Sequence, residues 1–197
     1  MRDLILKMHM SLDGFVGDLD GGNRWMFGDD PEAKAWTVET IGNASLHIMG
    51  SRTFRDMAAY WPGSTDAFAP PMNQIPKAVF SRQGDAVLKT LQSAPLASLQ
   101  PGAESWARAY VASGDLGQGI ARMKAQDGKP IVAHGGASFA RSLVAQGLVD
   151  QFALLVHPVA LGKGQPVFCE LAAPQRLRLV DSRAFPGGSI AQIYRAA

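Results

Sequence analysis

Hydrophobic positions along the first part of the chain fall into two alternating patterns. Short apolar runs of strand length lie at residues 4–12, 46–49, 77–80, 106–111 and 130–133. Between them, apolar residues recur at helical spacing, which predicts helices. These helices are expected over residues 31–43, 51–59, 115–126 and 138–146. Strands that alternate with helices in this way are typical of a parallel sheet.

Several local signals fix the ends of these elements. Asp29 and Asp30 precede Pro31, which places acidic residues at the positive end of a helix and proline in its first turn. Gly147 closes the last predicted helix. The proline-rich residues 62–76 are predicted to be a loop, whereas residues 84–105 give no readable pattern.

The pattern changes near residue 150. Three strands are predicted with no helix between them, at residues 151–159, 176–185 and 189–194. Pro186, Gly187 and Gly188 join the last two as a hairpin. We therefore predict one α/β domain over residues 1–197, with a mostly parallel central sheet, antiparallel C-terminal strands and flanking helices.

Composition narrows the function classes. The 197 residues are 47% hydrophobic, enough for one sizeable core, and the 19 Lys and Arg residues form no run, so no nucleic-acid partner is expected. The apolar N-terminal stretch is too short for a signal or membrane helix. Cys169 is the single cysteine, and no two histidines have metal-ligand spacing. These features predict a soluble cytoplasmic protein without a metal.

Polar and glycine residues follow four predicted strands. They lie at residues 11–17, 50–53, 81–82 and 134–138. The carboxyl ends of parallel strands meet at one edge of a sheet, where open α/β sheets bind ligands. We therefore expect these four segments to line a single crevice.

Three of these segments suit phosphate groups. Residues 134–138 join a strand end, two glycines and a helix start, and exposed amides at a helix N-terminus bind anions. Residues 50–53 repeat the arrangement with a guanidinium, and Ser81 and Arg82 add a hydroxyl and a cation. Together they predict a ligand with several phosphates. For residues 134–138 alone, a tight turn capped by Ser138 is the alternative.

Motifs in a fixed order along nearly the whole chain resemble the dihydrofolate reductase superfamily. The similar segments are residues 10–16, 49–54, 81–82, 135–136, 147–150 and 158–164. The branch that they resemble most is the reductase domain of riboflavin biosynthesis, together with its stand-alone relatives. The resemblance implies an NADPH-dependent reductase. Because relatives in this branch commonly pair through a sheet edge, it also implies a homodimer.

The resemblance further implies which residues hold NADPH. The pyrophosphate is assigned to Gly135, Gly136, Ala137 and Ser138. Arg52 and Thr53, after Gly50 and Ser51, are assigned to the phosphates on the other side, and Ser81 and Arg82 to the adenosine 2′-phosphate. The nicotinamide is assigned to His9, Met10, Val16 and Gly17, beneath a loop at residues 14–22. Ser51 departs from the arginine that the branch usually has there, so altered phosphate affinity is expected.

The proton donor is ambiguous in the sequence. Folate reductases use a carboxylate at the start of the first helix, and counting from Trp25 reaches Asp30, whereas counting back from Gly50 reaches Lys34. Asp30 is the best candidate, followed by Asp29 and Glu32, and ordinary helix-start acidity is the alternative. His134, before the glycine pair, is a second candidate for proton donation or substrate binding. Its alternative is a buried structural histidine.

Three functions remain open at this stage. The first is an NADPH-dependent reductase of a small heterocyclic or carbonyl-type substrate. The second is the 5-amino-6-(5-phosphoribosylamino)uracil reductase of riboflavin biosynthesis. The third is a protein that binds NADPH without turnover.

Overall fold

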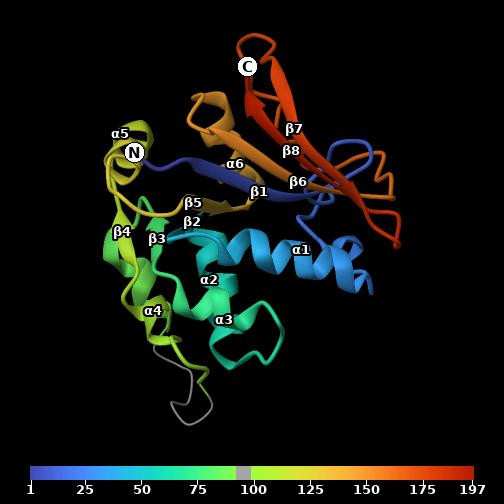
Figure 1. Cartoon of the computed structure of the whole chain (residues 1–197). Helices are drawn as coiled ribbons and strands as arrows, with labels where there is room; N and C mark the ends of the chain where they lie inside the picture. The colour runs from blue at the N-terminus through green and yellow to red at the C-terminus, as the bar shows by residue number, and fades with distance from the viewer. Residues whose placement is uncertain (92–98) are drawn as a thin grey trace.

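One eight-stranded sheet forms the centre of the molecule, in the order β4-β3-β2-β5-β1-β6-β8-β7 (Figure 1). The computed structural model describes residues 1–91 and 99–197. The strands are β1 (Leu4–Ser11), β2 (Leu46–Gly50), β3 (Lys77–Phe80), β4 (Tyr110–Ala112), β5 (Ile131–His134), β6 (Gln151–His157), β7 (Leu177–Ala184) and β8 (Ile190–Ala196). The main helices are α1 (Pro31–Gly42), α2 (Ser51–Tyr60), α3 (Ala69–Gln74), α4 (Glu104–Ala107), α5 (Leu116–Lys124) and α6 (Ala137–Ala145).

The direction of the strands confirms the predicted architecture. All pairings among β1 to β6 are parallel, whereas β8 pairs antiparallel with both β6 and β7. The single α/β domain with an antiparallel C-terminal edge is thus confirmed. Short 3₁₀ turns, η1 (Arg24–Met26), η2 (Trp61–Gly63) and η3 (Gly84–Leu91), complete the connections.

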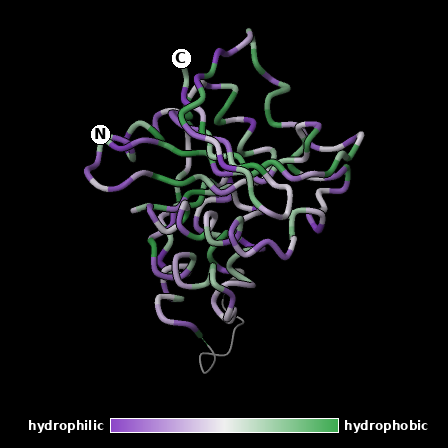
Figure 2. Tube along the Cα trace, turned by 45° about the vertical axis from the view of Figure 1, so that its right-hand side comes forward, coloured by the Kyte–Doolittle hydropathy of each residue, from purple (hydrophilic) through white to green (hydrophobic). Residues whose placement is uncertain are grey.

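Helices cover both faces of the parallel part of the sheet, whose strands are buried on both sides. On β1, Leu4, Leu6 and Met8 are buried in the core that includes α5 and α6. The opposite core includes residues of α1, α2, α3 and α4. Figure 2 shows hydrophobic residues along the central strands between these layers. Alternation along β1 places Lys7 and His9 on the face that carries α1.

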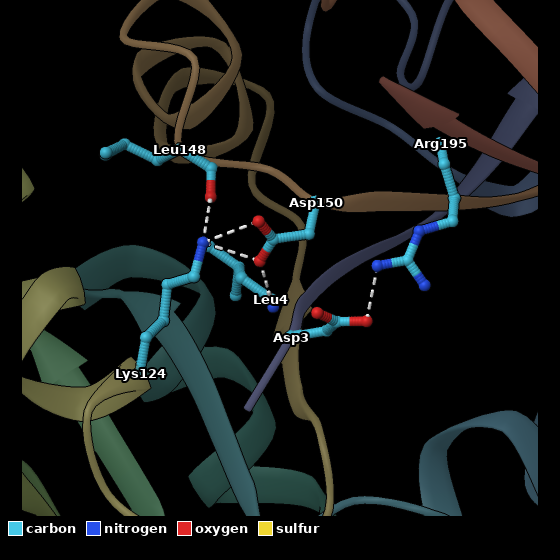
Figure 3. A network of polar contacts seen from close by, with 6 residues as sticks. All are labelled: Asp3, Leu4, Lys124, Leu148, Asp150 and Arg195. Carbon is cyan, nitrogen blue, oxygen red and sulfur yellow. Dashed lines mark hydrogen bonds and ion pairs between the residues drawn. The ribbon is translucent and has the colours of Figure 1, made fainter. Parts of the chain in front are cut away.

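Ion pairs fasten the amino edge of the sheet (Figure 3). The Lys124 ammonium at the end of α5 lies 2.5 Å from the Asp150 carboxylate, which also accepts the Leu4 amide at 2.7 Å. Arg195 of β8 pairs with Asp3 at 2.7 Å. These contacts join the first strand to the C-terminal half of the chain.

Two sequence predictions are corrected by the structure. The segment predicted as a loop over residues 62–76 contains α3, because prolines fit the first turn of a helix. Trp106 lies in α4 and not in a strand, and β4 begins only at Tyr110. Trp106 is buried, and its indole N–H donates to Asn73 Oδ1 at 2.9 Å. This contact holds the short helix α4 in place. In the unreadable region, residues 92–98 lie outside the described part.

Candidate functional site

The carboxyl ends of β3, β2, β5 and β1 lie side by side at one edge of the sheet (Figure 1). At about 4.8 Å between neighbouring strands, these four ends span about 14 Å. Thr53 Oγ1 donates to the Gly135 carbonyl at 3.2 Å, so the β2–α2 and β5–α6 junctions touch. Phe80 at the end of β3 packs against Phe139 of α6, with 5.3 Å between ring centroids. The predicted convergence of the strand ends is confirmed.

The β5–α6 junction leaves backbone amides open to an anion. Gly136 is the N-cap of α6 with φ +84, and no side chain caps this helix. A Cβ on Gly136 would lie 2.5 Å from Thr53 Oγ1, so a larger residue would crowd the junction. Gly136 and Ser138 are exposed, whereas Ala137 is buried. The glycine is therefore required both by its backbone conformation and by its close neighbour.

The β2–α2 junction has the same form with a cation added. Gly50 is the N-cap of α2, again with no side-chain cap, and Ser51 is half-buried. Arg52 is exposed and forms no ion pair within the described residues. An uncapped helix start beside a free guanidinium fits a phosphate group.

The end of β3 presents a hydroxyl and a second cation. Ser81 is buried, and its Oγ accepts the Gln83 amide at 3.1 Å, which shapes the turn after the strand. Arg82 is exposed, and no ion pair of the described residues involves it. The structure thus places Arg52 and Arg82 after adjacent strands, as the sequence predicts.

The loop after β1 is tied to the segment near residue 162. The Asp13 carboxylate accepts the amides of Leu161 and Gly162 at 3.1 and 2.6 Å, as well as the Ser11 hydroxyl. The Gly17 carbonyl accepts the Gln165 amide at 2.8 Å. Two distant motifs of the sequence therefore fold together. Val16 and Met10, two of the residues expected near the nicotinamide, are buried at this end of β1.

His134 is a buried imidazole at the end of β5. The His134 and His47 rings pack edge to face, with 4.4 Å between their centroids. The Nε2 atom of His134 has no hydrogen-bond partner within the described residues. Burial, with the nearby bases His47 and Lys7, holds the pKa of His134 well below its ordinary value. The side chain is therefore neutral near pH 7 and suited to hydrogen bonding rather than to carrying a charge.

Asp30 has a structural role as the N-cap of α1. One carboxylate oxygen accepts the amides of Glu32 and Ala33 at 3.0 and 3.1 Å, and the other accepts the Gly187 amide at 2.6 Å. The hydrogen bond from Ala33 is the largest cause that lowers the pKa of Asp30. These contacts favour the helix-start alternative over the catalytic one. Lys34, the other outcome of the count, pairs with Asp66 at 2.8 Å.

Sequence reasoning missed a group of bases on β1 and β6. Lys7 is buried, and its ammonium contacts His9 Nε2. His9 Nδ1 lies 2.8 Å from His157 Nε2, and His157 Nδ1 lies 3.4 Å from the Ser189 hydroxyl. Polar residues alternating inside the apolar run of residues 4–12 were the available signal.

Two further surveys of the described residues bear on the class of protein. No helix among them is long and apolar enough to cross a membrane. They also contain no group of three or more His, Cys, Asp or Glu side chains arranged to hold a metal ion.

The fold is that of a single-domain α/β protein with glycine, hydroxyl and arginine residues gathered beyond the carboxyl ends of parallel strands, which is where open α/β sheets bind ligands. The chain belongs to the RibD C-terminal domain family, whose model matches residues 2–191. Membership in this family supports a reductase of the riboflavin-pathway type. YyaP of Bacillus subtilis (strain 168) is 26% identical over 193 residues, covering 98% of this chain and 94% of that protein. YwjB of the same organism is 24% identical over 193 residues, covering 98% and 97%.

Solved structures share the fold at lower sequence identity. A putative riboflavin biosynthesis protein from Shewanella sp. PV-4 has a TM-score of 0.72 and 18% identity, with 99% of each chain covered. The deaminase/reductase of Thermotoga maritima has a TM-score of 0.69 and 15% identity, covering all of this chain and 57% of that one. Dihydrofolate reductase from Enterococcus faecalis, in complex with NADP(H), has a TM-score of 0.60 and 13% identity, covering 98% and 96%. The dihydrofolate-reductase-like fold is confirmed.

Proposed function

We propose that the protein is an NADPH-dependent reductase of a small heterocyclic or carbonyl-type substrate. The observation that carries the proposal is that the ends of β3, β2 and β5 lie next to one another and carry features suited to anions. Two of them start helices without side-chain caps, and exposed arginines follow two of them. A dinucleotide with an additional phosphate matches this distribution of donors.

Each phosphate-bearing part of the cofactor is matched by one of these three strand ends. The pyrophosphate is proposed to lie on the amides that follow Gly136, because that junction has no room for a Cβ. Arg52 is proposed to bind a phosphate from the β2 side, and Ser81 and Arg82 the adenosine 2′-phosphate. The cofactor supplies a hydride when bound, and the protein supplies position and a proton.

The proposed nicotinamide end lies at β1, beside the buried bases. Burial lowers the pKa of Lys7 to about 7, so its ammonium can release a proton near neutral pH. Asp30 is less suited to this role, because both its oxygens accept backbone amides. We therefore propose Lys7 as the proton donor and neutral His134 as a hydrogen-bonding group in the same region.

Cofactor binding can be tested without knowing the substrate. Titration with NADPH is expected to quench tryptophan fluorescence, and NADH is expected to bind much more weakly. Arg82→Ala should weaken NADPH binding by about tenfold, ~1.4 kcal/mol, while leaving NADH binding unchanged. Arg122→Ala is the matched control, because Arg122 is exposed in the last turn of α5, towards the amino edge of the sheet. Equal responses to NADPH and NADH in the wild type would remove the assignment of Ser81 and Arg82.

The family match favours one specific substrate as a second candidate. The Thermotoga protein is described as a deaminase and 5-amino-6-(5-phosphoribosylamino)uracil reductase, and this chain matches 57% of its length. NADPH absorbance should therefore be followed with this pyrimidine, dihydrofolate and oxidised pterins. Consumption with the pyrimidine alone would identify the pathway reductase. Binding of NADPH with no consumption across the panel would favour a protein that binds the cofactor without turnover.

We also propose that two copies pair through a sheet edge. Strand β7 is one of the two outer strands of the sheet, and Leu179 and Val180 on it are 49% and 47% exposed. Exposed apolar residues on an unpaired edge strand favour pairing with another chain. Sedimentation analysis tests this directly, since a monomer at micromolar concentration would contradict it.

A further inference from the structure

A hydrogen-bonded row of bases runs from β1 across β6, strands that lie side by side in Figure 1, to Ser189, the residue before β8. It runs from the Lys7 ammonium through His9 and His157 to the Ser189 hydroxyl. The two imidazoles stack, with 5.1 Å between ring centroids. Trp25 meets His157 edge to face at 5.7 Å. We call the three bases Lys7, His9 and His157, together with Trp25 that packs against His157, the basic row.

The chemistry of the groups fixes the direction of these hydrogen bonds. An ammonium only donates, so when Lys7 is protonated His9 Nε2 accepts. His9 Nδ1–H then donates to His157 Nε2, and His157 Nδ1–H points to the Ser189 oxygen. Both imidazoles are neutral in this arrangement. The positive charge therefore stays on Lys7.

Several donors of the row are left without an acceptor. The ammonium has three N–H groups, and His9 is its sole hydrogen-bond partner among the described residues. The Trp25 indole Nε1 is buried and has no partner in the same part of the chain. An indole nitrogen can only donate, so it requires an acceptor from outside the protein. Unpaired buried donors are costly and mark a site where a ligand supplies the missing oxygen.

The charge of the row is also uncompensated. The titratable groups that face Lys7 are His9 on its own strand, His134 on β5 and His157 on β6, and all three are bases. No carboxylate pairs with any of them in residues 1–91 or 99–197. Asp30, the carboxylate that the sequence suggested as proton donor, is held by backbone amides. A buried cation without a partner is strongly unfavourable, which an anionic ligand would relieve.

We propose that the basic row binds an anionic oxygen of the substrate, from either a carboxylate or an ionised ring carbonyl. The inference rests on the proposed reductase function, because the row lies beside the proposed nicotinamide end at His9 and Met10. It specifies that function further: the substrate is an anion at its recognised edge.

Matched pairs of probes test the charge preference without any cofactor. Benzoate and benzamide differ in charge at nearly equal size, as do barbiturate, which is ionised at neutral pH, and uracil, which is neutral. Binding to the wild-type protein is measured by calorimetry at pH 6.5. We expect at least one anion of the two pairs to bind about tenfold more tightly than its neutral partner. A preference for benzoate alone indicates a carboxylate, and a preference for barbiturate alone indicates an ionised ring.

A substitution links the preference to the row. Lys7→Met should remove the anion preference, whereas Lys129→Met, which removes an exposed charge, should leave it intact. In the wild type, the preferred anion should also shift the ring proton signals of His9 and His157 but not those of His47, whose Nε2 bonds the Ile41 carbonyl. This second readout does not depend on the variant. Equal affinities within both pairs, or a preference that persists in Lys7→Met, would overturn the proposal.

The outcome is separable from that of the proposed function. Equal affinities within both probe pairs in the wild type, together with normal NADPH binding, reject the anionic substrate and keep the reductase. Anion binding without NADPH binding rejects the reductase and keeps the anion site.

Discussion

Positively charged side chains have different partners at the two ends of the parallel strands, the amino edge and the carboxyl edge of the sheet. At the amino edge, Lys124 and Arg195 lie 2.5 and 2.7 Å from the carboxylates of Asp150 and Asp3 (Figure 3). Towards the carboxyl edge, among the described residues, His9 is the hydrogen-bond partner of Lys7, and neither Lys7 nor Arg52 forms an ion pair. Lys124 and Arg195 are thus neutralised within the protein, whereas Lys7 and Arg52 have no carboxylate partner among the described residues.

This difference separates stability from binding. A neutralised pair that also accepts a backbone amide, like Asp150, holds elements together and has little left to offer a ligand. A buried lysine without an acid costs folding free energy, and is explained by what it binds. The comparison therefore predicts that substitutions at the two edges change different measured quantities.

The largest effect is expected at the β5–α6 junction. Gly136→Ala places a Cβ 2.5 Å from Thr53 Oγ1 at a backbone with φ +84. The crowded junction closes over the amides proposed to bind the pyrophosphate, so NADPH affinity should fall about a hundredfold, ~2.7 kcal/mol. Fluorescence titration with NADPH measures the change.

The matched control lies at the other end of the same helix. Gly147 follows α6 with φ +65, and its Cβ would meet nothing within 4 Å. Gly147→Ala therefore introduces the same kind of backbone strain, about 1–2 kcal/mol, without crowding a ligand. If both variants lost NADPH affinity equally, the loss would come from strain in α6 and the pyrophosphate assignment would fail.

The second effect concerns the stability cost of Lys7. Burial lowers its pKa from 10.5 to about 7, so the folded protein releases a proton that the unfolded chain retains between these values. The cost is full below pH 7 and disappears as the pH rises towards 10.5. Lys7→Met should thus raise the free energy of unfolding by on the order of 3–5 kcal/mol at pH 6, a gain that shrinks by about 1.4 kcal/mol per pH unit above 7.

Urea denaturation at pH 6 and pH 9 measures this gain. Burial also lowers the pKa of Lys77 to about 7, and this ammonium donates hydrogen bonds to Asn73, Ile75 and Ser105. Lys77 is present in both proteins, so its own pH dependence cancels in the difference between the variant and the wild type. A Lys7→Met protein that is less stable than wild type at pH 6 would show that Lys7 is a structural residue, contrary to the contrast between the edges.

The fold was predictable because its signals are local. Apolar runs alternate with helical spacing, and Asp30 and Gly147 mark helix ends where the structure has them. The segment around Trp106 was not predictable from periodicity, since α4 is a single turn and its position depends on Asn73, 33 residues away. Short helices that are held by distant contacts carry no repeating pattern of their own.

The candidate site divides in the same way. Residues around Gly136 and Arg52 follow strand ends, so topology alone brings them together. The basic row depends on the pairing of β1 with β6 and of β6 with β8, which the sequence of a single strand does not reveal. Besides capping α1, Asp30 accepts the amide of Gly187, 157 residues away, a contact that the sequence does not reveal. The sequence alone therefore could not distinguish this structural carboxylate from a catalytic one.

A smaller effect is expected at the amino edge. Asp150→Ala removes the partner of Lys124 and the acceptor of the Leu4 amide, in a contact that is part-buried. The free energy of unfolding should fall by about 1–2 kcal/mol, and NADPH and benzoate affinities should stay within twofold of wild type. Paired urea denaturation and ligand titrations check both halves of this statement. A loss of ligand affinity comparable with the loss of stability would show that the edges are not independent.

The smallest effect is expected from Asp30→Asn, which decides between capping and catalysis. Asparagine keeps a side-chain oxygen for the amides of Glu32 and Ala33, so the melting temperature should change by no more than about 2–3 °C. Because the folded-state pKa of Asp30 lies below 3.8, any stability that its charge contributes is present at neutral pH and is lost as the pH falls through that lower value. The difference between Asp30→Asn and wild type should therefore vanish in acid. Reduction of whichever panel compound is consumed should continue in the variant. If reduction stopped while melting and NADPH binding were unchanged, the carboxylate would be the proton donor after all, and Lys7 would bind the anion without supplying the proton.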